Sequence, residues 1–177
     1  MSIKRLSSFV PLSLAAGIII LDQITKAIVV SKIPLGTYVS DPDKFFQIVH
    51  LRNKVIAFSL GDSLPDAVKP VLFVVVPLAI VVFLCWYFFT SQDLSKFQRW
   101  VLSGIIGGGI GNIIDRIFRP DGVVDFISIR FYGIFGMERW PTFNIADSAV
   151  VSCVLLFLVS IFLPSKKAQE IDKGKTE

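Results

Sequence analysis

Four aspartates lie inside or beside apolar stretches of this sequence, where ionisable residues are rare: Asp22, Asp115, Asp125 and Asp147. A charged residue in a membrane helix costs about 2.5–3.5 kcal/mol on insertion scales, so each one needs an explanation. Two carboxylates held close together share a proton, because they cannot both ionise easily. The ionised member can then activate a water molecule while the protonated member polarises a carbonyl, which gives peptide hydrolysis without a covalent intermediate.

The remaining side chains offer few other chemistries. His50 is the only histidine, and the two cysteines, Cys85 and Cys153, lie inside long apolar runs. The sequence therefore lacks the spacing of a metal site, a disulfide framework and the Ser/His/Asp pattern of a conventional hydrolase. We expect neither a metal ion nor another cofactor.

The composition places these aspartates in a membrane protein. The chain has 177 residues, of which 53% are hydrophobic and 18% charged, whereas soluble domains are about 25% charged. Its net charge of +4 comes from basic residues scattered near the ends of apolar runs. That distribution is typical of membrane topology and argues against nucleic-acid binding.

Four stretches reach the length of about 20 apolar residues that a membrane helix needs. We predict spans at roughly 9–31, 71–89, 100–118 and 143–163. The first span has no small-residue cleavage pattern, so we expect it to remain in the protein. Together they predict one membrane domain over residues 1–164, followed by a polar tail at 165–177.

Basic residues precede the first span, lie in the short connection between the second and third spans, and follow the fourth span. This bias predicts that both termini are cytoplasmic. The outer segments are then roughly 32–69 and 119–142. In the first, the β-prone runs 45–51 and 55–60 predict a small sheet on the membrane surface. The second contains another such run at 123–129, followed by a turn-rich stretch.

With this orientation, polar residues of three spans fall at one depth, near the outer face. They are Asp22 and Lys26 in span one, Asn112, Asp115 and Arg116 in span three, Asn144 and Asp147 in span four, with Asp125 shortly after span three. Structural explanations exist for several of them. Asp22 and Lys26 can form a neutralising i,i+4 ion pair, Asp115 and Arg116 can anchor the interface, and Asn144 can cap span four. Capping does not account for Asp147.

The spacing alone leaves open which two aspartates form the proton-sharing pair. We favour Asp125 and Asp147, because Asp22 has Lys26 and Asp115 has Arg116 to keep it ionised. Span three also carries two small-residue rows, which predict close helix packing rather than a nucleotide-binding loop. The rows are Ser103, Gly107 and Gly111, and Gly104 and Gly108.

Four ordered blocks resemble the signature blocks of the lipoprotein signal peptidases (signal peptidase II). They are DQITK at 22–26, GGGIGNIIDR at 107–116, VVDFI at 123–127 and FNIADS at 143–148. The resemblance implies four membrane helices with an extracytoplasmic β-cradle and a helical loop. It also implies cleavage of prolipoproteins on the N-terminal side of a diacylglyceryl-modified cysteine in the bacterial inner membrane, and inhibition by globomycin-type cyclic peptides.

By the same motifs, the resemblance implies a catalytic pair of Asp125 and Asp147. The supporting or substrate-binding residues would be Asp22, Lys26, Asn53, Asn112, Arg116 and Asn144. The family has Gly where this chain has Val55, and the stretch at 128–142 is longer than usual. We expect the longer stretch to form a larger flap over the site.

Two other function classes fit parts of the sequence. A small transporter or channel could use the aspartates as a proton or cation site, but it would need polar residues through the full membrane depth, and span two has no Asp, Glu, Lys, Arg or His from Val71 to Phe89. A purely structural membrane scaffold would leave the aspartates and the repeated Asn/Asp spacing unexplained.

Overall fold

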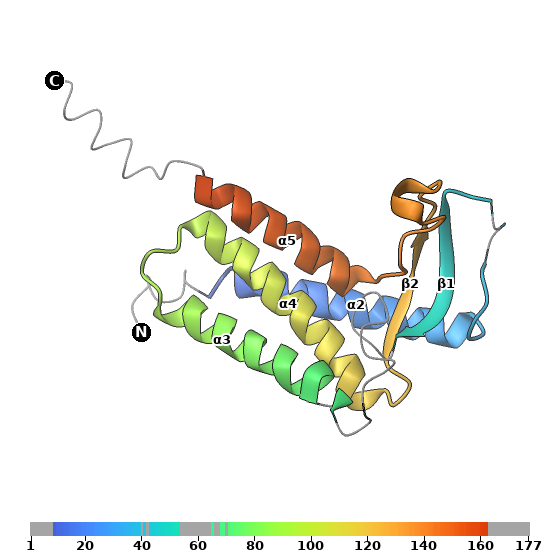
Figure 1. Ribbon diagram of the computed structural model, residues 1–177. Coiled ribbons are helices and arrows are strands. Elements are labelled where there is room, and N and C mark those ends of the chain that lie inside the picture. Colours follow the sequence, from blue (N-terminus) through green and yellow to red (C-terminus); the bar gives the residue numbers. More distant parts are fainter. Residues whose placement is uncertain are drawn as a thin grey trace.

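The computed structural model describes residues 9–39, 41, 43–53, 65, 68–69 and 71–162. The predicted strand at 55–60, the Val55 departure, the N-terminal basic pair and the polar tail lie outside these residues. Four described helices are long and apolar enough to cross a membrane, which confirms the predicted mainly helical class (Figure 1). The elements are α2 (Leu12–Lys32), β1 (Phe46–Asn53), η1 (Val71–Val75), α3 (Val76–Thr90), α4 (Lys96–Phe118), β2 (Val123–Ile129), η2 (Ile134–Gly136) and α5 (Ile145–Phe162).

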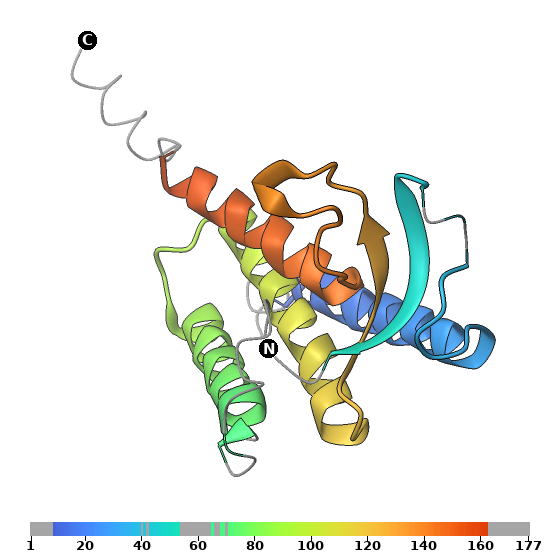
Figure 2. The same ribbon diagram turned by 45° about the vertical axis from the view of Figure 1, so that its right-hand side comes forward.

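Helix α4 is the centre of the bundle and packs against α2, α3 and α5. Figure 2 shows it between α3 on one side and α5 and α2 on the other. The outer helices expose large apolar side chains such as Ile20, Phe83 and Leu155, as expected of surfaces that face lipid. The polar site therefore depends on how α4 meets its two neighbours, α2 and α5.

The two small-residue rows of α4 allow these close contacts, which confirms the helix-packing interpretation. Gly107 and Gly111 face α2, where a Cβ on Gly107 would lie 2.7 Å from Cα of Ala15. Gly104 and Gly108 face α5 and leave no room for a methyl group. Because glycine has no side chain, both neighbours approach the α4 backbone directly.

Within the described residues, the small sheet pairs β1 with β2 from the other outer segment, a pairing that the sequence analysis did not predict. The strands are antiparallel, with Leu51 opposite Asp125 and Asn53 opposite Val123. Val123 and Val124 are almost fully buried. An edge strand this apolar needs a partner along its length, and β1 supplies it. This pairing brings Asn53 and Asp125 to the same end of the sheet.

Between β2 and α5 the chain folds into a compact loop, residues 131–140, that we call the aromatic lobe. It contains η2 and is closed by backbone bonds from Phe131 N–H to Glu138 O (2.7 Å) and from Trp140 N–H to Ile129 O (2.9 Å). Its side-chain hydrogen bonds join β2 and the segment before β1. The expected larger flap over the site stays a prediction.

Candidate active site

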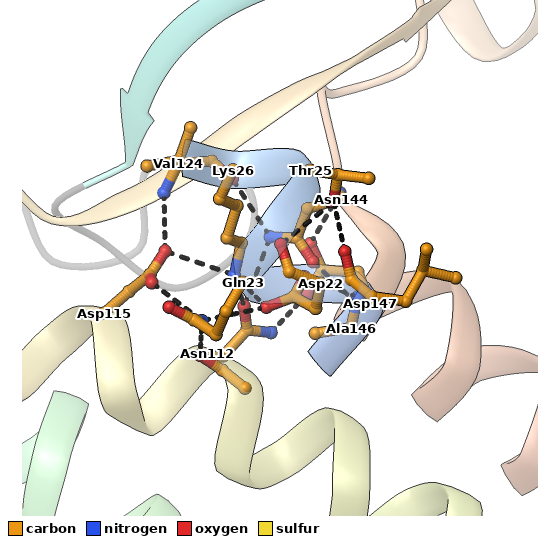
Figure 3. A network of polar contacts seen from close by, with 12 residues as sticks. Asp22, Gln23, Thr25, Lys26, Asn112, Asp115, Val124, Asn144, Ala146 and Asp147 are labelled. Carbon is orange, nitrogen blue, oxygen red and sulfur yellow. Dashed lines mark hydrogen bonds and ion pairs between the residues drawn. The ribbon is translucent and has the colours of Figure 1, made fainter. Parts of the chain in front are cut away.

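Polar side chains from α2, α4 and α5 and the start of β2 meet at one end of the bundle (Figure 3). At the centre is Lys26, which is 0% exposed. Its Nζ donates to Oδ2 of Asp22 (2.8 Å), Oδ2 of Asp115 (3.1 Å) and Oδ1 of Asn112 (3.1 Å). An ammonium group has three N–H donors, so Lys26 is fully satisfied. Removing one partner of a buried ion pair costs about 3–5 kcal/mol, so these contacts hold α2 and α4 together firmly.

Asp115 is ion-paired as expected, but the expected partner was wrong. Its Oδ1 accepts a hydrogen bond from Nη1 of Arg119 (2.8 Å), and its Oδ2 accepts one from the N–H of Val124 (3.0 Å). Arg119 lies four residues after Asp115 and therefore on the same helical face, whereas Arg116 is only one residue away and points elsewhere. Asp115 thus links α4 to the start of β2.

Asp22 connects α2 to the beginning of α5. Its Oδ1 accepts a hydrogen bond from the N–H of Ala146 at 3.0 Å, one of the first N–H groups of α5, which have no partner inside the helix. Its other carboxylate oxygen binds Lys26. Asp22 therefore stabilises the N-terminus of α5 by both a hydrogen bond and its negative charge.

Asn144 caps α5 as predicted, and Asp147 takes part in the same cap. Oδ1 of Asn144 accepts from the N–H of Asp147 (2.9 Å), while Oδ2 of Asp147 accepts from the N–H of Asn144 (3.2 Å). This reciprocal pair has the form of a capping box. The expectation that capping leaves Asp147 unexplained was therefore wrong in part. The cap occupies Oδ2, and Oδ1 receives a bond from Nδ2 of Asn112 (2.7 Å).

Asp125 projects from β2 and is only 2% exposed. Its Oδ1 accepts from Nδ2 of Asn144 (2.8 Å) and its Oδ2 from Nδ2 of Asn53 (2.9 Å). Burial raises the pKa of Asp125 to about 7, and the negative charge of Asp147 acts in the same direction. The two amide bonds oppose this increase. The Asp125 carboxyl is thus able to hold a proton near neutral pH.

Arg116 lies partly buried beside this group. Its guanidinium is within electrostatic range of Asp147, Asp125 and Asp115. Among the hydrogen bonds and ion pairs of the described residues, none involves Arg116. Its five N–H donors are therefore available to a bound molecule that approaches the aspartates. No three His, Cys, Asp or Glu side chains in the described part of the chain are grouped so that they could hold a metal ion.

The family model described as signal peptidase (SPase) II matches residues 14–163, most of the chain. The chain belongs to the signal peptidase II family. The lipoprotein signal peptidase of Treponema pallidum (strain Nichols) is 42% identical over 160 residues, which cover 90% of this chain and 86% of that protein. That of Borreliella afzelii (strain PKo) is 42% identical over 169 residues, which cover 95% and 98%.

A solved structure described as a bacterial membrane enzyme has the same fold. It matches with a TM-score of 0.73 at 28% identity, covering 86% of this chain and 87% of that one. As a signal peptidase II, the protein is a multi-pass membrane aspartic peptidase that removes signal peptides from prolipoproteins. Membership confirms the resemblance read from the four blocks and sets aside the transporter and scaffold interpretations.

The structure brings the predicted residues together in this signal peptidase II, and it adds two that the sequence interpretation missed. Nε2 of Gln23 donates to Asp22 (3.1 Å), Asp115 (3.1 Å) and the carbonyl of Gly111 (3.0 Å). Arg119 is the second. Both left a signal, since Gln23 is a polar residue inside an apolar span and Arg119 has i,i+4 spacing to Asp115.

Proposed function

We propose that Asp125 and Asp147 are the catalytic pair of this peptidase. The observation that carries the proposal is the difference between the four aspartates. Asp22 and Asp115 are both bound to the buried ammonium of Lys26. The hydrogen bonds recorded for Asp125 and Asp147 come from amide groups of the side chain or backbone, and Asn144 contacts both carboxylates. The first two are thus paired with a cation, while the other two have no such partner in these bonds and are free to share a proton.

In the proposed mechanism, Asp125 is the protonated member and Asp147 the ionised one. Burial of Asp125 favours its protonated form near neutral pH. Asp147 lies in the first turn of α5, where the helix N-terminus favours negative charge. Asp147 removes a proton from water as the water oxygen attacks the scissile carbonyl, whose oxygen receives a hydrogen bond from Asp125. Collapse of the tetrahedral intermediate then breaks the C–N bond, and Asp147 gives the proton it took from water to the leaving amine nitrogen.

Arg116 has a separate proposed role, in holding the substrate. A guanidinium with available donors suits the backbone carbonyl oxygens of an extended peptide. Asn53, Asn112 and Asn144 have positioning roles, because each donates an amide hydrogen bond to a catalytic carboxylate. Lys26 and Asp22 act one step further away, by fixing Asn112 and the start of α5.

We further propose that the protein lies in the bacterial inner membrane with both termini in the cytoplasm. The site is then at the outer face, where α2 and α4 end and α5 begins. The distribution of basic residues around the spans supports this orientation. The substrate would be a prolipoprotein with a diacylglyceryl-modified cysteine, cut on the N-terminal side of that cysteine and drawn from the surrounding lipid. Globomycin-type cyclic peptides would compete for the same site.

A cleavage assay with purified protein tests the proposal. Wild type, Asp125→Asn and Asp147→Asn are each incubated with a diacylglyceryl-modified prolipoprotein, and the product is followed by gel shift and mass spectrometry. Asp43→Asn is the matched control, because the Asp43 side chain is 83% exposed and lies outside the site. We expect cleavage at the modified cysteine by wild type and Asp43→Asn only. Near-normal cleavage by either of the other variants would remove that aspartate from the pair.

A further inference from the structure

The aromatic lobe carries an exposed apolar tip that the proposed mechanism does not use. Tyr132, Ile134 and Phe135 are 63%, 52% and 85% exposed. The five consecutive residues 132–136 are all exposed and include no charged side chain. An apolar surface of this kind on a folded loop usually marks a contact with another hydrophobic partner.

The lobe is built to keep this tip exposed. Tyr132 and Phe135 adopt left-handed backbone conformations, with φ of 53° and 54°, which are unfavourable for aromatic residues. Backbone hydrogen bonds from Gly136 to Gly133 (2.9 Å) and from Met137 to Ile134 (3.1 Å) enforce the turn. The chain thus accepts backbone strain in a conformation that turns Phe135 outward instead of folding it against the protein.

The base of the lobe is polar. Nε of Arg130 donates to Glu138 (2.8 Å), its Nη1 donates to Asp43 (3.0 Å), and its guanidinium lies 5.3 Å from the ring centre of Tyr132. Nε of Arg139 donates to Oγ of Ser128 (2.7 Å). Charged groups at the base and apolar groups at the tip make the lobe amphipathic. Such a surface fits the boundary between lipid headgroups and acyl chains.

The position of the lobe identifies its partner. Figures 1 and 2 both show the orange loop that contains η2 on the α5 side of the sheet. The outward side of α5 is formed by apolar residues such as Val151, Leu155 and Leu158, which are 59%, 58% and 49% exposed. In a membrane-spanning helix that surface faces lipid. The lobe therefore lies on the side of the sheet from which a lipid-facing helix extends.

We propose that the tip of the aromatic lobe inserts into the lipid leaflet beside α5 and anchors the β1–β2 sheet to the membrane surface. Aromatic side chains are enriched at the membrane interface, because their rings are apolar and their edges tolerate headgroups. Tyr132 and Phe135 occupy that depth, and Arg130 and Glu138 remain at headgroup level. The lobe lies between Asp125 and Asp147 in the chain, so the anchor also fixes β2 and its aspartate relative to the bilayer.

Spin labelling of the full-length protein in phosphatidylcholine bilayers tests this anchor. Cys85→Ala and Cys153→Ala give a cysteine-free background, into which Phe135→Cys or the control Asp43→Cys is introduced for nitroxide labelling. Collision rates with oxygen, which concentrates in lipid, and with a water-soluble nickel complex are then compared by electron paramagnetic resonance. We expect oxygen collisions to exceed nickel collisions several-fold at position 135 and the order to reverse at position 43.

Two results would overturn the proposal. Nickel collisions that dominate at position 135 would place the tip in water. Low collision rates with both reagents would place it against protein, as in contact with a second copy of the chain. Tyr132→Cys provides an independent measurement on the same tip, so a folding defect in the Phe135→Cys variant does not prevent the test. Cleavage activity is not needed for the readout, which separates this proposal from that of the catalytic pair.

Discussion

Lys26 fixes the orientation of the Asn112 side-chain amide. Nζ of Lys26 donates to Oδ1 of Asn112 (3.1 Å), which turns Nδ2 of the same amide toward Oδ1 of Asp147 (2.7 Å). An ammonium group can only donate hydrogen bonds. The reverse orientation of the amide would therefore point the N–H groups of Nδ2 at the N–H groups of Lys26. A cation on α2 therefore positions a carboxylate on α5 through an amide on α4.

This relationship predicts that Lys26→Met impairs both folding and catalysis. The variant keeps the apolar stem but leaves Asp22 and Asp115 without their buried cation. We expect the free energy of unfolding to fall by about 3–5 kcal/mol, as measured by thermal unfolding in detergent micelles, and cleavage to be lost. Lys44→Met, at an exposed position before β1, is the matched control and should change neither. A Lys26→Met protein as stable as wild type would contradict the central role of this ion pair.

The pH dependence of cleavage should have an alkaline limb set by Asp125. As the protonated member of the pair, Asp125 loses its proton when the pH rises through its pKa of about 7. We expect kcat/KM to fall about tenfold per pH unit above that value, with an apparent pKa that belongs to the coupled pair. A pH profile from 5 to about 9 on a short lipidated peptide measures it. Full activity at the alkaline end would show that Asp125 is not the acid.

The same raised pKa predicts that Asp125 makes the wild-type protein easier to unfold as the pH rises. An acid whose pKa is higher in the folded than in the unfolded state makes unfolding easier as the pH rises from about 4 to about 7. Asp125→Asn removes that titration. We expect the variant to be inactive, and between pH 5 and pH 8 to lose about 1–4 kcal/mol less free energy of unfolding than wild type, since each unit of pKa is worth about 1.4 kcal/mol. Melting temperatures of wild type and Asp125→Asn, each measured at pH 5 and pH 8, check this difference in pH dependence.

Gly107→Ala should separate α2 from α4. A Cβ at this position would lie 2.7 Å from Cα and 2.8 Å from O of Ala15, both backbone atoms that cannot rotate away. We expect a loss of about 1–3 kcal/mol in the free energy of unfolding and reduced activity, because Asp22 and Lys26 move with α2. Gly17→Ala is the control on α2, where nothing lies within 4 Å of the added methyl group. It should be neutral or stabilising by up to about 1 kcal/mol.

Asn144→Ser separates the capping role of Asn144 from its contact with Asp125. Serine caps helices about as well as asparagine, so the cap should persist. The free energy of unfolding should fall by about 1–3 kcal/mol, because the buried acceptors of Nδ2 lose their donor. The variant loses the Nδ2 donor that binds Oδ1 of Asp125 (2.8 Å). We expect kcat to fall by roughly 2–10-fold, the equivalent of one buried hydrogen bond to the neutral Asp125 carboxyl. An unchanged kcat would show that the cap is the only function of Asn144.

The sequence predicted the helices and the polar cluster well because both depend on local patterns. Long apolar runs define the spans, and the orientation of alternate spans brings Asp22, Asp115 and Asp147 to one depth without knowledge of the packing. The pairing of β1 with β2 could not be read in this way. The two strands are separated by two membrane helices, and strand pairing over such a distance depends on the assembled bundle rather than on any local signal.

Two contacts of the site follow from helical spacing, although the sequence analysis did not predict them. Sequence adjacency suggested Arg116 as the partner of Asp115, whereas helical periodicity favours Arg119. Likewise, Asn144 and Asp147 have the N-cap to N3 spacing of a capping box, yet Asp147 was treated as separate from the cap. In both cases the position of a residue around the helix was more informative than its distance along the chain.

The cap at the start of α5 also bears on the biogenesis of the enzyme. Asn144 and Asp147 belong to the last span, and the N–H of Ala146 provides the bond that joins it to Asp22 in the first. During synthesis, Asp22 and Lys26 enter the membrane before these partners exist, and their i,i+4 spacing allows them to pair with each other. Asp147, the second aspartate of the proposed pair, arrives only with the last span. By that proposal, an interrupted or truncated nascent chain has no assembled catalytic pair, and proteolysis waits until insertion has finished.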